Sequence, residues 1–367
     1  MKFQIDRESL LAPLSHLIGV VEKRQTMPIL SNVLMRLSEG VLEITATDTE
    51  VQLIARVDVE AGEEGTVTAP ARKLLDIFRL LPDQSRVNLN VKGDRLMLGA
   101  GSSKFSLTTL PVENYPAFDL GQSDLEVTLP ATTFRTALEK TLFAIAQQDV
   151  RYYLKGLLID FEGATLRTVA SDGHRLAVFQ ETLADGFAAN RQIIVPRKGV
   201  LELYRLLADV ADEVTLQISP NTLRANIGSL SFSTKLIDGR YPDYRRVLPQ
   251  ECATTIVVER DHLRSALGRV GLMTNEKQKS ITLEASASGE MVLTGQSMEQ
   301  DDAEERLTVT AEGASVSVGF NTGYLIEAIN HVSGAELRLS FTPAGNSCLV
   351  EDPDDPRYRC VVMPMRL

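Results

Sequence analysis

Residues 166–179 read LRTVASDGHRLAVF, two short runs of strand-like alternation that meet at Asp172-Gly173. An Asp-Gly pair between two such runs predicts a hairpin, because the turn requires a positive φ angle that glycine adopts at little cost. Two other stretches have the same layout: residues 42–57, with Thr47-Asp48-Thr49 at the corner, and the looser residues 291–309. We infer from these three copies that the chain is built as a repeat.

The other expected elements recur in the same order, about every 125 residues. Each copy opens with an amphipathic helix, continues through an apolar strand and the hairpin, and adds a second helix and closing strands. The second helices of the first two copies match best, as APARKLLDIFRLLP from residue 69 and VPRKGVLELYRLLA from residue 195. The predicted helices are residues 7–21, 71–81, 130–146, 197–207, 260–270 and 321–332, and the predicted strands after the first helices are residues 29–37, 153–161 and 280–286.

Length and repetition together predict three domains of one α+β fold. The chain has 367 residues, of which 44% are hydrophobic, so each domain can bury a core of its own. We place the domains at residues 1–125, 126–253 and 254–367. Repeats of this kind usually stack side by side and bury a continuous surface.

The positive charge of the chain is concentrated on the predicted helices. The whole chain carries a net charge of −11, which alone disfavours non-specific binding of nucleic acid. Five of the six helices are nevertheless net positive when the first is counted to Arg24. Such a helix array can line a path for a phosphate backbone while the acidic remainder keeps the protein soluble. Basic helix faces that only contact water are the alternative.

The sequence gives little support to disulfides, metal sites or membrane segments. The three cysteines have no Cys-x-x-Cys spacing and the four histidines are far apart, so we expect no metal and no cofactor. No apolar stretch approaches the ~18 residues of a membrane span, and the N-terminal MKFQIDRESL lacks an apolar signal core. We therefore expect a soluble, cytoplasmic protein.

Four longer motifs carry a resemblance to a known family. They are DGHRL at residues 172–176, IVPRKG at 194–199, DGRYPDYRRVLP at 238–249 and VVMPMRL at 361–367. Over its whole length the chain resembles the bacterial DNA polymerase III β subunits, the β sliding clamps. The resemblance implies three DNA-clamp domains with helices lining the inside and antiparallel sheets outside, closed head to tail into a dimeric ring.

The function implied by the resemblance is that of a processivity factor and not of an enzyme. The ring would encircle duplex DNA without reading its sequence, close to the nucleoid. A peptide-binding cleft between domains 2 and 3 would tether partners through short hydrophobic peptides. These partners would be the DNA polymerase III catalytic subunit, the clamp loader, other DNA polymerases and mismatch-repair factors.

Three sets of site residues follow from the resemblance. The residues expected at the DNA are Arg24, Arg72, Lys73, Gln148, Tyr152, Tyr153, Arg197 and Lys198. The residues expected in the cleft are Leu154, Ser171, Gly173, His174, Arg175, Leu176, Pro242, Arg246, Val247, Asn321, Tyr324, Ser347, Val361, Met363, Pro364, Met365 and Arg366. The residues expected at the dimer interface are Lys104, Phe105, Leu107, Leu272, Met273, Glu299, Glu304 and Glu305.

The chemistry of these residues suits the implied sites. Leucine, valine, methionine and proline give the cleft an adaptable apolar floor, and Arg175, Arg246 and Asn321 can orient a peptide backbone or an acidic group. The acidic run of the third copy and the basic residues of the first suit a contact of fixed polarity. An exposed solubilising loop is the alternative for the acidic run, and packing at a strand start is the alternative for one of the two tyrosines.

Three features suggest other functions. Ser171 and His174 suggest a serine hydrolase, but a triad needs groups that converge in space, and the Gly-x-Ser-x-Gly elbow is absent. LGAGSSK at residues 98–104 has some likeness to a phosphate loop, but the GxxxxGK[ST] spacing is absent and a strand turn explains it. A β-rich peptide-binding scaffold that never meets DNA is the third class, and the basic helices disfavour it.

Overall fold

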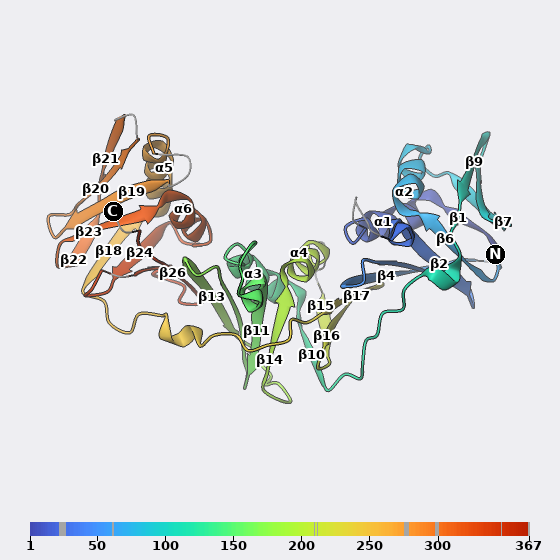
Figure 1. The fold of residues 1–367 in the computed structure, drawn as a ribbon, viewed down its shortest axis with the longest axis horizontal. Coiled ribbons are helices and arrows are strands. Elements are labelled where there is room, and N and C mark those ends of the chain that lie inside the picture. Colours follow the sequence, from blue (N-terminus) through green and yellow to red (C-terminus); the bar gives the residue numbers. More distant parts are fainter. Residues whose placement is uncertain are drawn as a thin grey trace. The chain divides into compact units, whose positions relative to one another are not determined.

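The computed structural model describes residues 1–21, 27–60, 62–208, 210, 212–274, 279–297, 301–345 and 347–365. Its contacts group the chain into two units: residues 1–135 with 198–236, and residues 136–197 with 237–367. Each unit contains two antiparallel sheets with helices packed against them (Figure 1). No helix of the described residues is both long and apolar enough to cross a membrane.

The first unit contains a five-stranded and an eight-stranded sheet. The smaller sheet has the order β5-β1-β7-β8-β9, so β9 is an edge strand; its strands are β1 Lys2–Asp6, β5 Gly62–Glu63, β7 Arg86–Lys92, β8 Arg95–Ala100 and β9 Ser103–Thr108. The larger sheet has the order β10-β15-β16-β17-β4-β3-β2-β6; its strands are β2 Asn32–Ser38, β3 Val41–Thr47, β4 Val51–Asp58, β6 Gly65–Pro70, β10 Leu125–Pro130, β15 Glu213–Ile218, β16 Thr222–Ile227 and β17 Leu230–Lys235.

The second unit contains a nine-stranded and a four-stranded sheet. The larger has the order β14-β11-β12-β13-β26-β25-β24-β18-β22; its strands are β11 Gly156–Glu162, β12 Thr165–Ser171, β13 Arg175–Thr182, β14 Arg191–Pro196, β18 Thr254–Glu259, β22 Thr310–Gly313, β24 Glu336–Phe341, β25 Cys348–Glu351 and β26 Tyr358–Val362. The smaller has the order β21-β20-β19-β23, so β21 is an edge strand; its strands are β19 Ser280–Ser286, β20 Glu290–Gln296, β21 Asp302–Thr308 and β23 Val316–Asn321.

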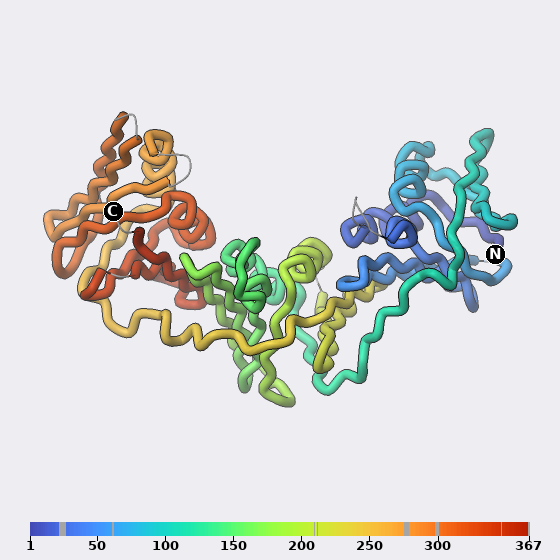
Figure 2. Tube along the Cα trace, in the orientation of Figure 1, coloured from blue at the N-terminus to red at the C-terminus, as the bar shows by residue number. Residues whose placement is uncertain are grey.

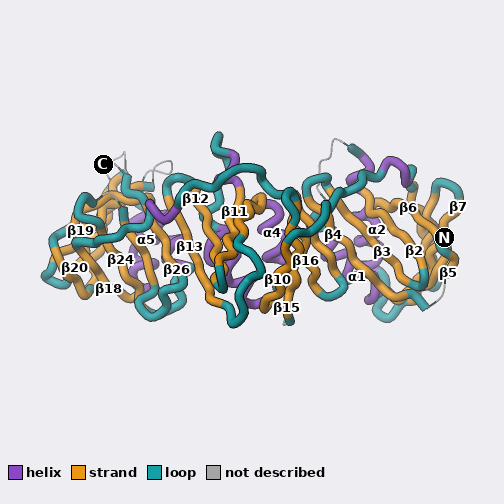
Figure 3. The backbone as a smooth tube through the Cα atoms, turned by 90° about the horizontal axis from the view of Figure 1, so that it is seen from below, coloured by secondary structure: helices purple, strands orange, loops and turns teal. Residues whose placement is uncertain are grey.

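Six α-helices lie in the described residues, close to the predicted ranges. Helices α1 and α2 pack together in the first repeat and α5 and α6 in the third, and α1 and α2 cover the face of the sheet that contains β2, β3 and β4 (Figure 3). Side chains cap two helix starts: Glu259 accepts from two backbone N–H groups of α5, and Asn321 accepts from one of α6. The helices are α1 Arg7–Leu17, α2 Ala71–Leu80, α3 Ala131–Leu142, α4 Arg197–Leu206, α5 Arg260–Gly271 and α6 Thr322–Asn330.

The hairpin at residues 166–179 is confirmed, and its loop has the same hydrogen bonds as the loop of the first copy. Strands β12 and β13 pair from Thr165 to Thr182, and Gly173 adopts a φ of 86°. Asp172 accepts from two backbone N–H groups in the second copy, as Asp48 does in the first. Thr49 holds the matching positive φ, so the turn itself accepts another residue; at position 173 a Cβ would lie 2.5 Å from the guanidinium of Arg151, and glycine lets that side chain lie against the turn.

Neighbouring repeats share continuous sheets, which is why the contacts form two units. Strand β17 of the second repeat pairs with β4 of the first, and β26 of the third pairs with β13 of the second. A basic side chain closes each junction: Arg205 donates to the carbonyl of His16 at 2.6 Å, and Lys140 donates to the carbonyl of His331. Both carbonyls lie at helix C-termini, where cations are stabilising.

Several predicted boundaries are wrong. Each repeat begins with a strand, β1, β10 or β18, before its first helix. The predicted strands at residues 29–37 and 153–161 begin as 3-10 turns, Pro28–Ser31 and Tyr152–Lys155; the N–H of Leu30 donates to the carbonyl of Met27, and that of Leu154 to the carbonyl of Arg151. Helix α1 ends at Leu17 and is net neutral, so four of the six observed helices are net positive, not five. The turn between β8 and β9 confirms that residues 98–104 form a strand turn.

Candidate functional site

A pocket of about 180 Å³ in the second unit is the candidate functional site. Four segments far apart in the sequence form it: a turn before β11, the β12–β13 loop, the linker after β17, and the residue after β26. Its lining is mostly apolar, which suits an inserted hydrophobic side chain. The lining residues are Arg151, Tyr153, Leu154, Ser171, Gly173, Arg175, Leu176, Tyr241, Pro242, Tyr244, Val247 and Met363.

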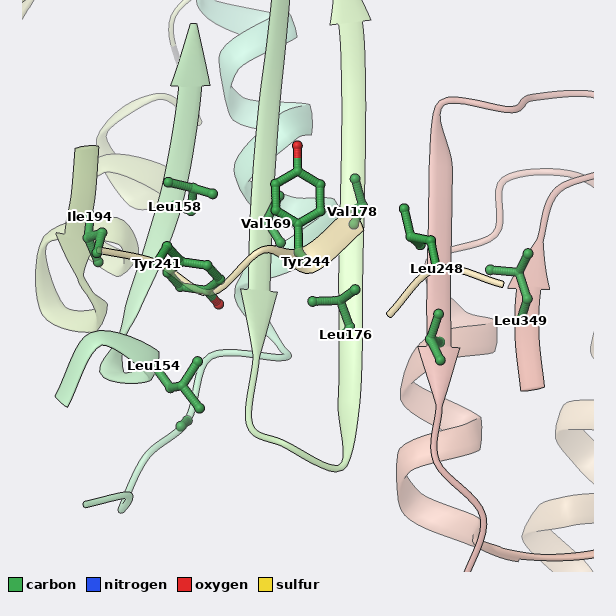
Figure 4. Packing of buried hydrophobic residues seen from close by; sticks show 12 residues of the cluster. Leu154, Leu158, Val169, Leu176, Val178, Ile194, Tyr241, Tyr244, Leu248 and Leu349 are labelled. Atoms are coloured by element: carbon green, nitrogen blue, oxygen red, sulfur yellow. The ribbon is translucent and has the colours of Figure 1, made fainter. Parts of the chain in front are cut away.

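The linker, residues 237–253, forms one wall of this pocket. Its tube passes across the strands of the nine-stranded sheet (Figure 2), and the rings of Tyr241 and Tyr244 lie over β11, β12 and β13 (Figure 4). Both tyrosines are buried in one cluster with Leu154, Leu176 and neighbouring apolar residues. Burial raises the pKa of both hydroxyls, so both stay protonated well above neutral pH.

Arg175 fixes the β12–β13 loop at the other wall. Its side chain is 7% exposed, and its guanidinium pairs with Asp172 at 3.2 Å, with Glu327 of α6, and with the carbonyl of Phe143 at 2.9 Å. The guanidinium also lies over the rings of Phe143 and Tyr324. Arg175 therefore joins three elements, and it contributes to the pocket mainly by positioning its walls.

Aromatic and backbone contacts extend the site toward α6. His174 is exposed and stacks on Tyr324, with ring centroids 5.7 Å apart. The N–H of Met363 donates to the carbonyl of His174 at 2.8 Å, and Met365 forms a bridge with Gly319. The C-terminal segment thus crosses from the pocket to β23 and leaves Met363, Pro364 and Met365 partly exposed.

The structure brings about half of the predicted cleft residues into the pocket. Leu154, Ser171, Gly173, Arg175, Leu176, Pro242, Val247 and Met363 line it. His174, Asn321, Tyr324, Pro364 and Met365 belong to the extension toward α6, whereas Val361 and Ser347 are buried and Arg246 points to solvent with 86% of its side chain exposed. Arg366 lies outside the described residues. The prediction missed Arg151, Tyr241 and Tyr244 and assigned Tyr153 to the DNA.

Tyr241 could have been found from the repeat itself. Tyr115-Pro116 in the first copy matches Tyr241-Pro242 in the second, and the Tyr115 hydroxyl donates to the carbonyl of Thr45, on the first strand of the hairpin of its own copy, at 2.9 Å. The equivalent position of Tyr241 is against the second hairpin, β12–β13.

The residues predicted at the DNA lie in both units and are mostly exposed. Arg72, Lys73 and Gln148 are exposed, Arg197 and Lys198 are half-buried, and Arg24 lies outside the described residues. Tyr152 is 55% exposed, whereas Tyr153 packs against the pocket cluster, so one tyrosine of the pair is core. Several basic groups already have partners: Lys198 pairs with Asp48, and Arg72 donates to the carbonyl of Val21.

The residues predicted at a dimer interface lie on edge strands or beside them. Lys104, Phe105 and Leu107 are on β9, and Glu304 and Glu305 are on β21. The acidic run is therefore a strand from Asp302 and not only a loop; Glu299 lies outside the described residues. Glu305 pairs with Arg269 of its own chain at 2.6 Å, and Leu107 is only 8% exposed. Leu272 and Met273, after α5, expose 78% and 41% of their surface.

His331 lies at the junction of the second and third repeats. Its ring stacks on Phe143 with centroids 4.2 Å apart, and its Nδ1–H donates to the carbonyl of Glu327 at 2.8 Å. Burial lowers the pKa of this imidazole, and the ammonium of Lys140 acts in the same direction. The fold therefore favours the neutral ring.

We expect the stability of this junction to fall as the pH drops below about 6.5, the pKa of an unfolded histidine. A lowered folded pKa means that the unfolded chain binds the proton more tightly, so the contribution of His331 is present above that pH and is lost below it. Carboxylates with lowered pKa, such as Asp355, lose their contribution only at lower pH. Urea unfolding between about pH 7.5 and pH 5 should show a smaller loss for His331→Phe than for the natural chain. Equal losses would contradict the assignment.

Three family models match the chain in order, and they describe the DNA polymerase III beta subunit: its N-terminal domain at residues 1–119, its central domain at 128–243 and its C-terminal domain at 245–366. The beta sliding clamps of Vibrio cholerae and Escherichia coli K12 are 45% and 42% identical in sequence to this chain, and each alignment covers all of both chains. The chain belongs to the DNA polymerase III beta subunit family. A crystal structure of such a clamp from Pseudomonas aeruginosa, bound to griselimycin, matches all of both chains with a TM-score of 0.96 and 41% identity.

Membership of the sliding-clamp family establishes three DNA-clamp domains and a replication function without catalysis. The hydrolase alternative also fails on geometry, because the Ser171 hydroxyl donates to the carbonyl of Arg175 and accepts from the N–H of Gly173. All three cysteines are free, and no cluster of potential metal ligands occurs among the residues that the structure describes.

Proposed function

We propose that this sliding clamp encircles duplex DNA as a head-to-tail dimeric ring and tethers its partners through the pocket described above. The observation that carries the ring is that the strand edge used for pairing between neighbouring repeats is open at each end of the series, at β9 in the first repeat and at β21 in the third. Two chains that pair these edges twice would continue a sheet across both contacts, as β17–β4 and β13–β26 do inside the chain.

The junctions inside the chain supply a register for the pairing between chains. Strand β9 occupies the place of β17 and β26 in its repeat, and β21 occupies the place of β4 and β13. Inside the chain, Ser231 faces Ile54 and Phe232 faces Leu53. The hairpins β16–β17 and β8–β9 pair in the same register, which aligns Ser231 with Lys104 and Phe232 with Phe105. The hairpins β3–β4 and β20–β21 likewise align Ile54 with Glu304 and Leu53 with Ala303. Between chains, Lys104 would therefore lie opposite Glu304 and Phe105 opposite Ala303. The register supports the dimer, because it sets unlike charges face to face.

The exposed apolar residues and the charges support the rest of the interface. Leu272 and Met273 follow α5 beside β21, and such exposed large side chains commonly mark a contact surface. We assign Lys104, Phe105, Leu272, Met273 and Glu304 to the contact itself. Glu304 is exposed and pairs with Arg306 of its own strand, whereas Leu107 is buried and Glu305 is half-buried and pairs with Arg269 of α5. Leu107 and Glu305 therefore support the contact from their own domains.

The charge distribution supports loose contact with DNA. Arg72, Lys73, Gln148, Tyr152, Arg197 and Lys198 are proposed to meet the duplex. Because Lys198 and Arg72 are already engaged within the chain, they would give weak, screened contacts to phosphates. A ring held by topology needs no tighter contact, and tight contacts would oppose sliding.

The pocket is proposed to receive one or two apolar side chains of a partner's peptide. The partners would be the polymerase III catalytic subunit, the clamp loader, other polymerases and mismatch-repair factors. The relative from Pseudomonas aeruginosa binds griselimycin, so griselimycin is a direct probe of ligand binding here. Pro242, Val247, Tyr153 and Met363 are the accessible parts of the apolar lining.

Retention on circular DNA tests the ring. The protein, loaded by a clamp loader onto nicked circular DNA, should elute with the DNA in gel filtration and should be lost once the circle is cut at one site. Naked linear DNA of the same sequence is the control and should retain no protein. Equal retention on cut and intact circles would mean surface binding and would refute encirclement.

Two smaller assignments belong with this proposal. We place the domain boundaries near residues 125 and 253, which the first strands of the second and third repeats support: β10 begins at Leu125 and β18 at Thr254. We also propose that the clamp acts in the cytoplasm, on the DNA of the nucleoid.

A further inference from the structure

The part of the linker that forms the pocket wall is residues 240–248, which we call the strap. Upstream of it, the N–H of Ile237 donates to the carbonyl of Ile194, and downstream the N–H of Ala253 donates to the carbonyl of Phe341. The structure describes every residue between these points, and the linker makes only local backbone hydrogen bonds there: the N–H of Arg246 donates to the carbonyl of Asp243, and the N–H of Val247 to the carbonyl of Tyr244. The strap is therefore fastened to the sheet by side chains.

The polar fastening of the strap is a cluster of four charged residues that joins it to β11 and β12. Arg245 of the strap lies 3.1 Å from a carboxylate oxygen of Glu162 and 3.6 Å from one of Asp160, both on β11. Arg167 of β12 pairs with the same two carboxylates. Two guanidinium groups thus neutralise two carboxylates, and one of the two cations belongs to the strap.

Asp160 makes this cluster sensitive to the loss of either arginine. Its residue is only 3% exposed, and its Oδ2 has no hydrogen-bond partner within the described residues, so it depends on the two nearby cations. Removing one partner of a buried ion pair leaves an uncompensated charge, which costs more than the pair itself contributes. Loss of Arg245 would therefore favour water entry beneath the strap.

We propose that Arg245 is a positioning residue for the pocket: its ion pairs with Asp160 and Glu162 hold the strap, and with it Tyr241, Tyr244 and Val247, in the shape that receives a peptide. The proposal rests on the peptide-binding function proposed above. Arg245 does not line the pocket and need not touch the ligand.

The ion pairs of Arg245 with Asp160 and Glu162, which we call the latch, are accessible to dissolved salt. The Arg245 side chain is 53% exposed, and a second cavity of about 220 Å³ lies on this side of the strap, lined by Gln192, Arg240, Asp243, Arg245 and their neighbours. Ions that enter it screen the partly exposed pairs. Binding of an uncharged apolar ligand should then weaken as salt rises, although its own contacts carry no charge.

The experiment measures calorimetric affinity for two probes, griselimycin and the uncharged peptide N-acetyl-Gly-Leu-Leu-Phe-amide, from about 0.02 M to about 0.5 M salt. Arg245→Gln should weaken binding about fivefold at low salt and should remove the salt dependence, while Arg245→Lys should recover most of the affinity. Asp160→Asn should also reduce the salt dependence. Arg56→Gln, which removes an exposed cross-strand pair with Glu43 in the other unit, should match the natural chain.

The outcomes separate the two proposals. Binding by the natural chain with an unchanged affinity and salt dependence in Arg245→Gln would overturn the latch and leave the pocket function standing. Failure of the natural chain to bind either probe would overturn the pocket function, and the latch with it. Loss of affinity that Arg245→Lys does not recover would show that the cation is not what matters, and would overturn the latch.

Discussion

Reversing the charge of Lys104 or of Glu304 should weaken dimerisation about thirtyfold, and combining the two reversals should restore it. The register taken from the internal junctions sets these residues directly opposite each other across β9 and β21. Like charges placed directly opposite cost about 1 kcal/mol per pair, and a two-chain ring contains the contact twice. About 2 kcal/mol corresponds to the expected thirtyfold change in the dissociation constant.

Sedimentation equilibrium of Lys104→Glu, Glu304→Lys and the double variant measures the effect. Lys92→Glu is the matched control, because Lys92 is exposed on β7, an interior strand of the same sheet as β9, and should leave the dimer unchanged. A double variant as weak as the singles would contradict this register, although not dimerisation itself. Glu305→Lys is a poorer probe, since Glu305 is half-buried and pairs with Arg269 of α5, whereas the exposed Glu304 pairs with Arg306 of its own strand.

The difference between Glu304 and Glu305 shows what the sequence could not decide. The sequence shows the acidic run of the third copy, so an electrostatic contact could be predicted, but it could not tell which of Glu304 and Glu305 makes that contact. Alternation along β21 turns Glu305 toward α5 and leaves Glu304 outward, and that choice depends on a strand register set by β20. A one-residue shift would have exchanged their roles.

Local signals predicted the fold well, whereas long-range packing was hidden. The Asp172-Gly173 turn and the helices at 71–80 and 197–206 depend on neighbours in the sequence, and they were placed within a residue or two. The 3-10 turn at Tyr152 was missed because Tyr152 rests against Gly239, far along the chain. Tyr244 was missed in the pocket for the same reason: only the path of the linker brings it over β12 and β13.

Replacing Arg175 by methionine should lower the free energy of local opening around the pocket by about 3 kcal/mol. The guanidinium is nearly buried and holds Asp172, Glu327 and the Phe143 carbonyl together, so its loss leaves the carbonyl without its donor and two carboxylates without their cation. Native-state hydrogen exchange of amides in β13 and α6 measures this opening. The same variant should bind griselimycin far more weakly, because the β12–β13 loop and Tyr324 lose their common support.

Two comparisons decide whether the fork of Arg175, and not only its charge, is needed. Arg175→Lys keeps the charge but cannot reach three partners at once, so it should recover only part of the lost protection. Arg246→Met is the stability control: that side chain is 86% exposed, pairs only with Asp243 among the described residues, and should change local opening by less than about 0.5 kcal/mol. If Arg175→Met were as mild as the Arg246 control, the contacts of Arg175 would be incidental. The walls of the pocket would then be held by the tyrosines and leucines of the core alone, and apolar packing without a charged centre would be enough to shape the site.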